Sequence, residues 1–144
     1  MNFKHTLPSL VILLLVVLPG CTQTQLPEWL VGKWIFDTEA TIESSNSAMA
    51  NQAEPADSLA QLQALVLPMY GTMELSISQK EITATFKGGE KVVDISIHKI
   101  ESDKVTLKRS NGNLIEYHRT DKGFWTTSDD GKLELYFKKK DTSE

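Results

Sequence analysis

The strongest constraint on the fold is a period-two alternation of apolar and polar residues that runs from Thr72 to Lys138. Successive side chains of a strand point to opposite faces, so this period predicts strands with one apolar face. Short sequences rich in Gly, Asn and Asp separate the segments, which is typical of antiparallel strands joined in sequential hairpins. The residues expected to face inward are Met73, Leu75, Ile77, Ile82, Ala84, Phe86, Val93, Ile95, Ile97, Val105, Leu107, Ile115, Tyr117, Phe124 or Trp125, Leu133, Leu135 and Phe137.

One more strand is expected nearer the N-terminus, where Trp29–Asp37 is dense in aromatic and β-branched residues. It is followed by an insert, residues 38–68, in which leucines recur at helical spacing from Leu59 to Leu65 before Pro68. An open meander would leave two exposed edges, and closure removes both. We therefore predict a mainly β fold, an antiparallel up-and-down barrel of about eight strands, with one or two helices between the first and second strands.

The first 20 residues have the pattern of a secretory signal peptide. Lys4 supplies a positive charge, and the apolar run Leu7–Leu18 is shorter than the roughly 20 residues that span a bilayer. Of the 15 basic and 19 acidic residues, only Lys4 is lost with this segment, so the remaining chain is acidic. No basic face is evident for binding phosphates, which argues against a nucleic-acid partner.

Leu18-Pro19-Gly20-Cys21 resembles a bacterial lipobox, in which an aliphatic residue, a small residue and Gly or Ala precede a cysteine; Pro19 departs from that pattern. The resemblance implies that Cys21, the only cysteine, is diacylated and that the chain is cut before it. Two or more acyl chains anchor a protein stably in a membrane. Thr22 is not the Asp that favours inner-membrane retention, so the resemblance implies an outer-membrane lipoprotein facing the periplasm. The alternative is an ordinary signal peptide with a fortuitous cysteine.

Residues 21–28 would then be the lipidated cysteine and a polar tether, and residues 29–140 a single barrel domain. Within this domain, Gly32-Lys33-Trp34 followed by a helical insert and a meander resembles the calycin group, which includes lipocalins and fatty-acid-binding proteins. From the residues alone, Gly32 permits a bend or a close backbone approach, and the Trp34 indole can plug the barrel end. The Arg-x-Tyr of fatty-acid-binding proteins is missing near the C-terminus.

Tyr117 and Arg119 are the residues expected to bind a ligand, since they share the inward face with Ile115. A guanidinium beside a phenol would receive a ligand carboxylate. The alternative is that Arg119, at a strand end, leaves the core and pairs with an acid at the rim.

Hairpin spacing also predicts a row of side chains on the outer face. Its members are His98, Thr106, His118, Trp125 and Glu134. Strands lie about 4.8 Å apart, which would separate the two histidines by about 10 Å, too far to share a zinc ion. We therefore expect no metal and interpret the row as a solvated face or a protein-contact patch.

Two functions remain open. The first is a lipocalin-like barrel that binds a small apolar ligand or lipid, and the second is a protein-binding envelope lipoprotein, either a scaffold or an inhibitor of an attacking enzyme. No G-x-S-x-G or H-E-x-x-H motif is present, so we expect neither an enzyme nor a cofactor. A cavity of about 300 Å³ or more would favour the first function, and a packed interior the second.

Replacing Cys21 with serine tests the anchor. We expect the Cys21→Ser chain to move from the membrane fraction to the aqueous fraction, because the acylated thiol is gone. Membrane association equal to that of the unchanged chain would contradict the lipobox interpretation.

Overall fold

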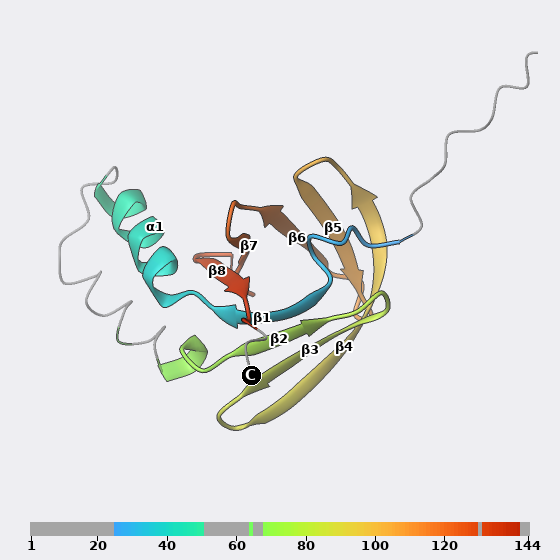
Figure 1. Cartoon of the computed structure of the whole chain (residues 1–144), viewed down its shortest axis with the longest axis horizontal. Coiled ribbons are helices and arrows are strands. Elements are labelled where there is room, and N and C mark those ends of the chain that lie inside the picture. The colour runs from blue at the N-terminus through green and yellow to red at the C-terminus, as the bar shows by residue number, and fades with distance from the viewer. Residues whose placement is uncertain (1–24, 51–63, 65–67, 130, 142–144) are drawn as a thin grey trace, which may run out of the picture.

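The computed structural model describes residues 25–50, 64, 68–129 and 131–141 (Figure 1). Each of its strands pairs antiparallel with the next, and the last pairs with the first, which closes a barrel of eight strands. This confirms the predicted up-and-down barrel. The strands are β1 (Gly32–Phe36), β2 (Glu74–Ile77), β3 (Glu81–Phe86), β4 (Gly89–Ile100), β5 (Lys104–Arg109), β6 (Leu114–Arg119), β7 (Gly123–Thr127) and β8 (Glu134–Lys139).

The predicted helical insert between the first two strands is confirmed. Helix α1 (Thr38–Ala50) follows β1, and residues 64 and 68–70 are also helical, so helical structure continues past Pro68, where it was expected to end. The Asp37 carboxylate accepts a hydrogen bond from the N–H of Ala40 (3.2 Å), which caps α1. The other insert residues lie outside the described part of the chain. None of the described helices is long and apolar enough to cross a membrane.

The buried residues follow the predicted alternation, but Phe86 at the end of β3, which was expected to face inward, is 38% exposed. Phe124, rather than Trp125, is the inward residue of β7. The inner residues of β4 are only half-buried, so the core is densest on the other strands. The buried apolar residues of the strands are Trp34, Phe36, Leu75, Ile77, Ile82, Val105, Leu107, Tyr117, Phe124, Leu135 and Phe137.

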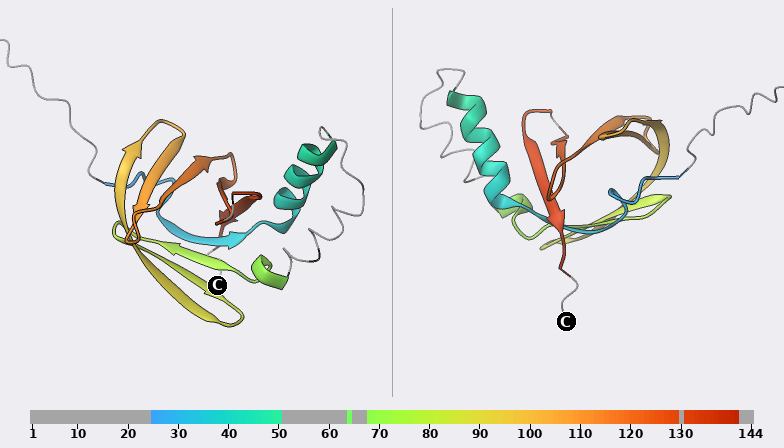
Figure 2. Two further views of the ribbon diagram at one scale, coloured as in Figure 1. Left: turned by 180° about the vertical axis from the view of Figure 1, so that it is seen from behind. Right: turned by 45° about the horizontal axis from the view of Figure 1, so that its top comes forward.

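One end of the barrel is closed by the segment before β1. Leu26 and Leu30 are buried, and the indole Nε1–H of Trp34 donates to the carbonyl of Leu30 (2.9 Å). A turn at Pro27 folds the segment back, and the side chain of Gln79 bonds both backbone groups of Leu26. Residues 25–28, expected to be tether, therefore include part of the core. This segment and α1 lie at opposite ends of the molecule (Figure 2).

The backbone conformation at the closed end explains the glycine of the G-x-W motif. Gly32 has a φ of 131°, which favours glycine, and an added Cβ would lie 2.8 Å from the Lys139 ammonium. That ammonium donates to the carbonyl of Val31 (2.9 Å) and lies 4.2 Å from the centroid of the Trp34 ring. A basic side chain thus covers the indole that fills the barrel end.

The predicted outer row is correct at one pair and wrong at the others. His118 lies opposite Trp125, and their rings stack with centroids 3.9 Å apart. On one side Thr106 lies opposite Lys99 rather than His98, because a bulge between Ile97 and Lys99 shifts β4. On the other side it lies opposite Glu116 rather than His118, because the turn between β5 and β6 is centred one residue earlier than expected.

The cross-strand partner predicted from hairpin spacing is also wrong at the last hairpin, β7–β8. Trp125 lies opposite Tyr136 rather than Glu134, since the turn is centred one residue later than expected. A displacement of a turn centre by one residue changes each cross-strand partner by two residues.

Gly123 gives a direct test of the β7–β8 pairing. An added Cβ would overlap the carbonyl oxygen of Phe137 and lie 3.1 Å from the Cα of Lys138. We expect Gly123→Ala to lower the free energy of unfolding by about 1–3 kcal/mol, because backbone atoms must move. At Gly88 the same methyl group would lie 3.8 Å from the Phe86 ring, so Gly88→Ala should stay within about 0.5 kcal/mol. Equal urea-unfolding curves for the two variants would contradict the pairing.

Candidate ligand-binding site

A cavity of about 150 Å³ lies at the other end of the barrel, where α1 leaves β1 and the insert returns to β2. In an up-and-down barrel, the last residues of odd strands and the first residues of even strands meet at one end. Short side chains on β3 and β4, Ala84 and Val93, leave the space there. The apolar lining consists of Met73, Leu75, Ile82, Ala84, Val93, Ile115, Leu135 and Phe137.

The volume limits what the cavity can enclose. It is about half of the 300 Å³ at which pockets for drug-sized ligands begin. An apolar cavity of about 150 Å³ is, however, large enough to hold benzene. The volume of about 300 Å³ that would favour ligand binding is therefore not reached, and the interior accommodates one small apolar group and not a long acyl chain.

A guanidinium lies at the mouth of this cavity. Arg109 shares the inward face of β5 with Val105 and Leu107, and its Nη1 lies 2.8 Å from Oδ1 of Asp129. The Arg109 side chain is 25% exposed and that of Asp129 is 77% exposed. The Asp129 carboxylate is thus mostly in solvent, whereas the Arg109 side chain is mostly covered at the apolar wall. Lys91, which is exposed, also lines the mouth.

Arg109 was not among the residues predicted to bind a ligand. The alternation that places Val105 and Leu107 inside places Arg109 on the same face, so the signal was present.

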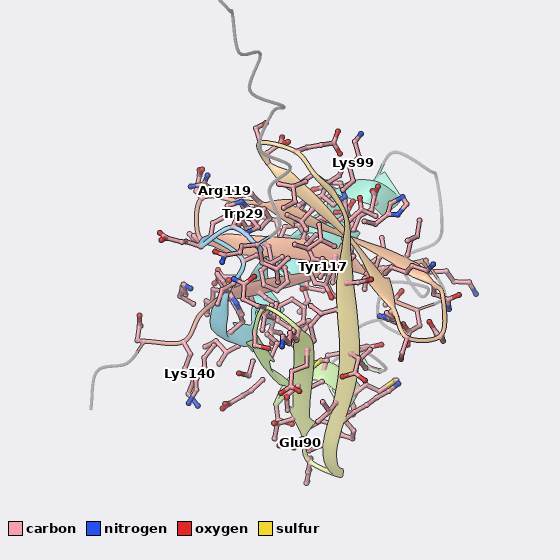
Figure 3. All side chains as sticks on the ribbon, turned by 90° about the vertical axis from the view of Figure 1, so that its right-hand side faces the viewer. Trp29, Glu90, Lys99, Tyr117, Arg119 and Lys140 are labelled. Carbon is pink, nitrogen blue, oxygen red and sulfur yellow. The ribbon has the colours of Figure 1, made fainter. Side chains whose placement is uncertain are left out.

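Tyr117 contributes a hydroxyl to the cavity wall. It is buried and lies in the middle of the barrel (Figure 3). Burial raises the pKa of its phenol well above the ordinary value; the nearby Arg109 opposes this shift and Asp129 adds to it. The phenol therefore keeps its proton at neutral pH. No described residue accepts a hydrogen bond from this hydroxyl, so it can donate to a ligand.

The structure does not bring Arg119 to Tyr117. Arg119 ends β6 at the closed end, where it is exposed and lines a shallow depression with Asp103, Thr120 and Asp121. Figure 3 shows it toward the edge of the barrel, away from the central Tyr117. Two residues along a strand cover about 6.6 Å, which places Arg119 opposite Phe124 in the β6–β7 pair, nearer the closed end than Tyr117. The basic residue that lines the cavity with Tyr117 is instead Arg109.

No metal centre accompanies the cavity. Within the described ranges, no three His, Cys, Asp or Glu side chains converge in a way that could hold an ion. Cys21, the predicted lipidation site, lies outside the described residues, so its acylation remains a prediction. Comparison with protein-family models, curated proteins and solved structures finds no match to this chain. Function must therefore be inferred from the geometry of the site.

The buried phenol predicts a pH effect on stability. Unfolding frees Tyr117 to ionise near its ordinary pKa of about 10, whereas the folded chain holds the proton to higher pH. Its contribution is therefore fully present below about pH 10 and is lost as the pH rises, by up to about 1.4 kcal/mol per pH unit. Urea unfolding at increasing alkaline pH should show a steeper loss for the unchanged chain than for Tyr117→Phe. Equal slopes would contradict the burial of this phenol in an apolar wall.

Proposed function

We propose that this chain is a membrane-anchored envelope lipoprotein whose barrel binds, without catalysis, a small ligand that has an apolar group and an anionic group. The apolar group occupies the cavity and the anionic group binds Arg109. The observation that carries this proposal is a guanidinium at the mouth of an apolar cavity, 2.8 Å from a carboxylate that is mostly in solvent.

The chemistry of the mouth supports an anion. Arg binds carboxylates through two parallel hydrogen bonds, and a ligand carboxylate can take the place of the Asp129 carboxylate. An exposed ion pair contributes only about 0–1 kcal/mol, so this exchange costs little. The Tyr117 hydroxyl adds a donor inside the cavity. The apolar lining stabilises a small ring or branched chain through burial.

The first described residues lie away from the cavity. Leu26 bonds to Gln79 at the closed end, whereas the cavity lies at the other end of the barrel. The lipobox resemblance supports acylation at Cys21, and Thr22 supports an outer-membrane location facing the periplasm.

Protein binding through the outer aromatic residues has less support. His118, Trp125 and Tyr136 are only partly exposed, and each ring is held by its neighbours. The Tyr136 backbone N–H donates to Thr41 of α1 (3.0 Å), and its hydroxyl donates to Glu134 (3.1 Å). These side chains stabilise the barrel wall and offer little free apolar surface.

Benzoate is a suitable probe, because its ring matches the cavity and its carboxylate matches Arg109. Titration of the mature Cys21→Ser chain, followed by amide chemical shifts, should perturb residues around the cavity. Arg109→Gln removes charge-assisted hydrogen bonds worth about 1.5–3 kcal/mol, so Kd should rise by about 10- to 100-fold. Arg119→Gln removes the same charge at the closed end and should change Kd by less than about twofold.

A third variant should strengthen benzoate binding. Asp129→Asn removes the competing carboxylate, so benzoate should bind up to about fivefold more tightly. The proposal fails if benzoate perturbs no cavity residue, or if Arg119→Gln weakens binding as much as Arg109→Gln does.

A further inference from the structure

The first half of β4 projects beyond its neighbour β5. β4 is 12 residues long, whereas β5 has 6 residues and pairs only with Ile95–Ile100. β3 pairs with the remaining part, Gly89–Asp94, on the opposite side. Figure 1 shows the β3–β4 hairpin extending past the other strands, and Figure 3 places Glu90 near its tip. Among the described residues, no strand covers the other side of this projection.

In the projecting part of β4, every second residue directs its backbone N–H and C=O groups to the side that no described strand covers. Successive residues of a strand direct their N–H and C=O groups to opposite neighbours. Ile95 donates its N–H toward the start of β3, and the Asp94 carbonyl accepts from the turn after β5 (3.2 Å). Glu90 and Val92 therefore direct their groups to the uncovered side, and both are exposed, Val92 by 52%. Such an edge is a template for an added strand.

This free edge ends at the ligand cavity. Lys91 and Val93 alternate with the edge residues and line the cavity from β4. Arg109 ends β5 where the uncovered part of β4 begins, opposite Ile95. A strand edge, a guanidinium and a space for one apolar side chain thus lie next to one another.

We infer that the site binds the carboxyl terminus of an extended protein segment whose last side chain is apolar. The backbone of that segment adds to the edge at Glu90 and Val92, its last side chain fills the cavity, and its terminal carboxylate binds Arg109. This inference rests on the proposed function and names its ligand class. It also accounts for the small volume, because a single residue brings one carboxylate and one side chain to adjacent positions.

The direction of the added segment follows from the position of Arg109. A segment that runs parallel to β4 moves from the hairpin tip at Gly89 toward Asp94, so its carboxyl terminus arrives at Arg109. An antiparallel segment would end at the tip, far from the guanidinium. Parallel pairing is slightly less stable per residue than antiparallel pairing, and the charged terminus and the buried side chain provide the remaining affinity.

The test uses the mature Cys21→Ser chain and a short fluorescein-labelled peptide of serine and threonine that ends in phenylalanine. Fluorescence polarisation should show binding of the free acid, and at least about tenfold weaker binding of the carboxyl-terminal amide. A peptide that ends in glycine should also bind at least about tenfold more weakly, since the cavity stays empty. N-acetylphenylalanine, which lacks the strand, should bind more weakly than the full peptide acid.

Variants of Val92 separate strand addition from simple ligand binding. Val92→Pro removes the edge N–H and should weaken the peptide about tenfold, whereas Val92→Ala keeps the N–H and should bind like the unchanged chain. Benzoate binding should be equal in both variants, because Val92 does not line the cavity. If Val92→Pro fails to fold, a peptide with N-methylated residues tests the same hydrogen bonds on the unchanged chain and should bind more weakly than the parent peptide.

The outcomes distinguish the two proposals. Benzoate binding with no preference for the full peptide acid over N-acetylphenylalanine would overturn the peptide inference and leave the proposed function intact. Equal peptide affinity for Val92→Pro and Val92→Ala would exclude pairing along this edge. No binding of either benzoate or peptide would overturn both.

Discussion

Pairing between β1 and β8 is the interaction on which the rest of the structure depends. β1 has only five residues, and it bonds to β2 on one side and to β8 on the other through Trp34, Ile35 and Phe36. This pairing removes the two edges that an open meander would expose. It also fixes the interior volume and turns the Trp34 indole inward. The cavity and the closed end both depend on this closure.

The two ends of the barrel differ because their interior side chains differ in size. Phe124 packs against Trp34, Tyr117 and Phe137 with ring centroids 5.0–5.4 Å apart. Trp34 fills the closed end, whereas Tyr117 and Phe137 on the other side of this aromatic layer line the cavity. Beyond the layer, a cavity of about 150 Å³ with a mainly aliphatic lining lies beside Arg109. A small volume with one guanidinium at its mouth favours a ligand that presents one apolar group and one anionic group.

Local alternation was sufficient to predict the number of strands and nearly all inward residues, because the period of two is a property of each strand alone. It could not predict registers, since a bulge between Ile97 and Lys99 or a turn centred one residue away changes the cross-strand partners that follow. Leu26 was missed because one apolar residue in a polar stretch carries no periodic signal. Alternation specifies a face and not a position along the barrel axis, so it could not decide whether Arg119 binds a ligand in the interior or lies at the rim. Arg109 carries the same signal on β5 and was not among the residues predicted to bind a ligand.

The central claim is that Arg109 receives an anionic group whose apolar part enters the barrel. A crystal structure of the mature Cys21→Ser chain grown with benzoate measures this most directly. We expect the ring in the cavity, the carboxylate about 2.7–2.9 Å from the Arg109 guanidinium, and Asp129 displaced into solvent. A structure in which Arg109 still pairs with Asp129, with benzoate absent from the barrel or bound elsewhere, would contradict the claim.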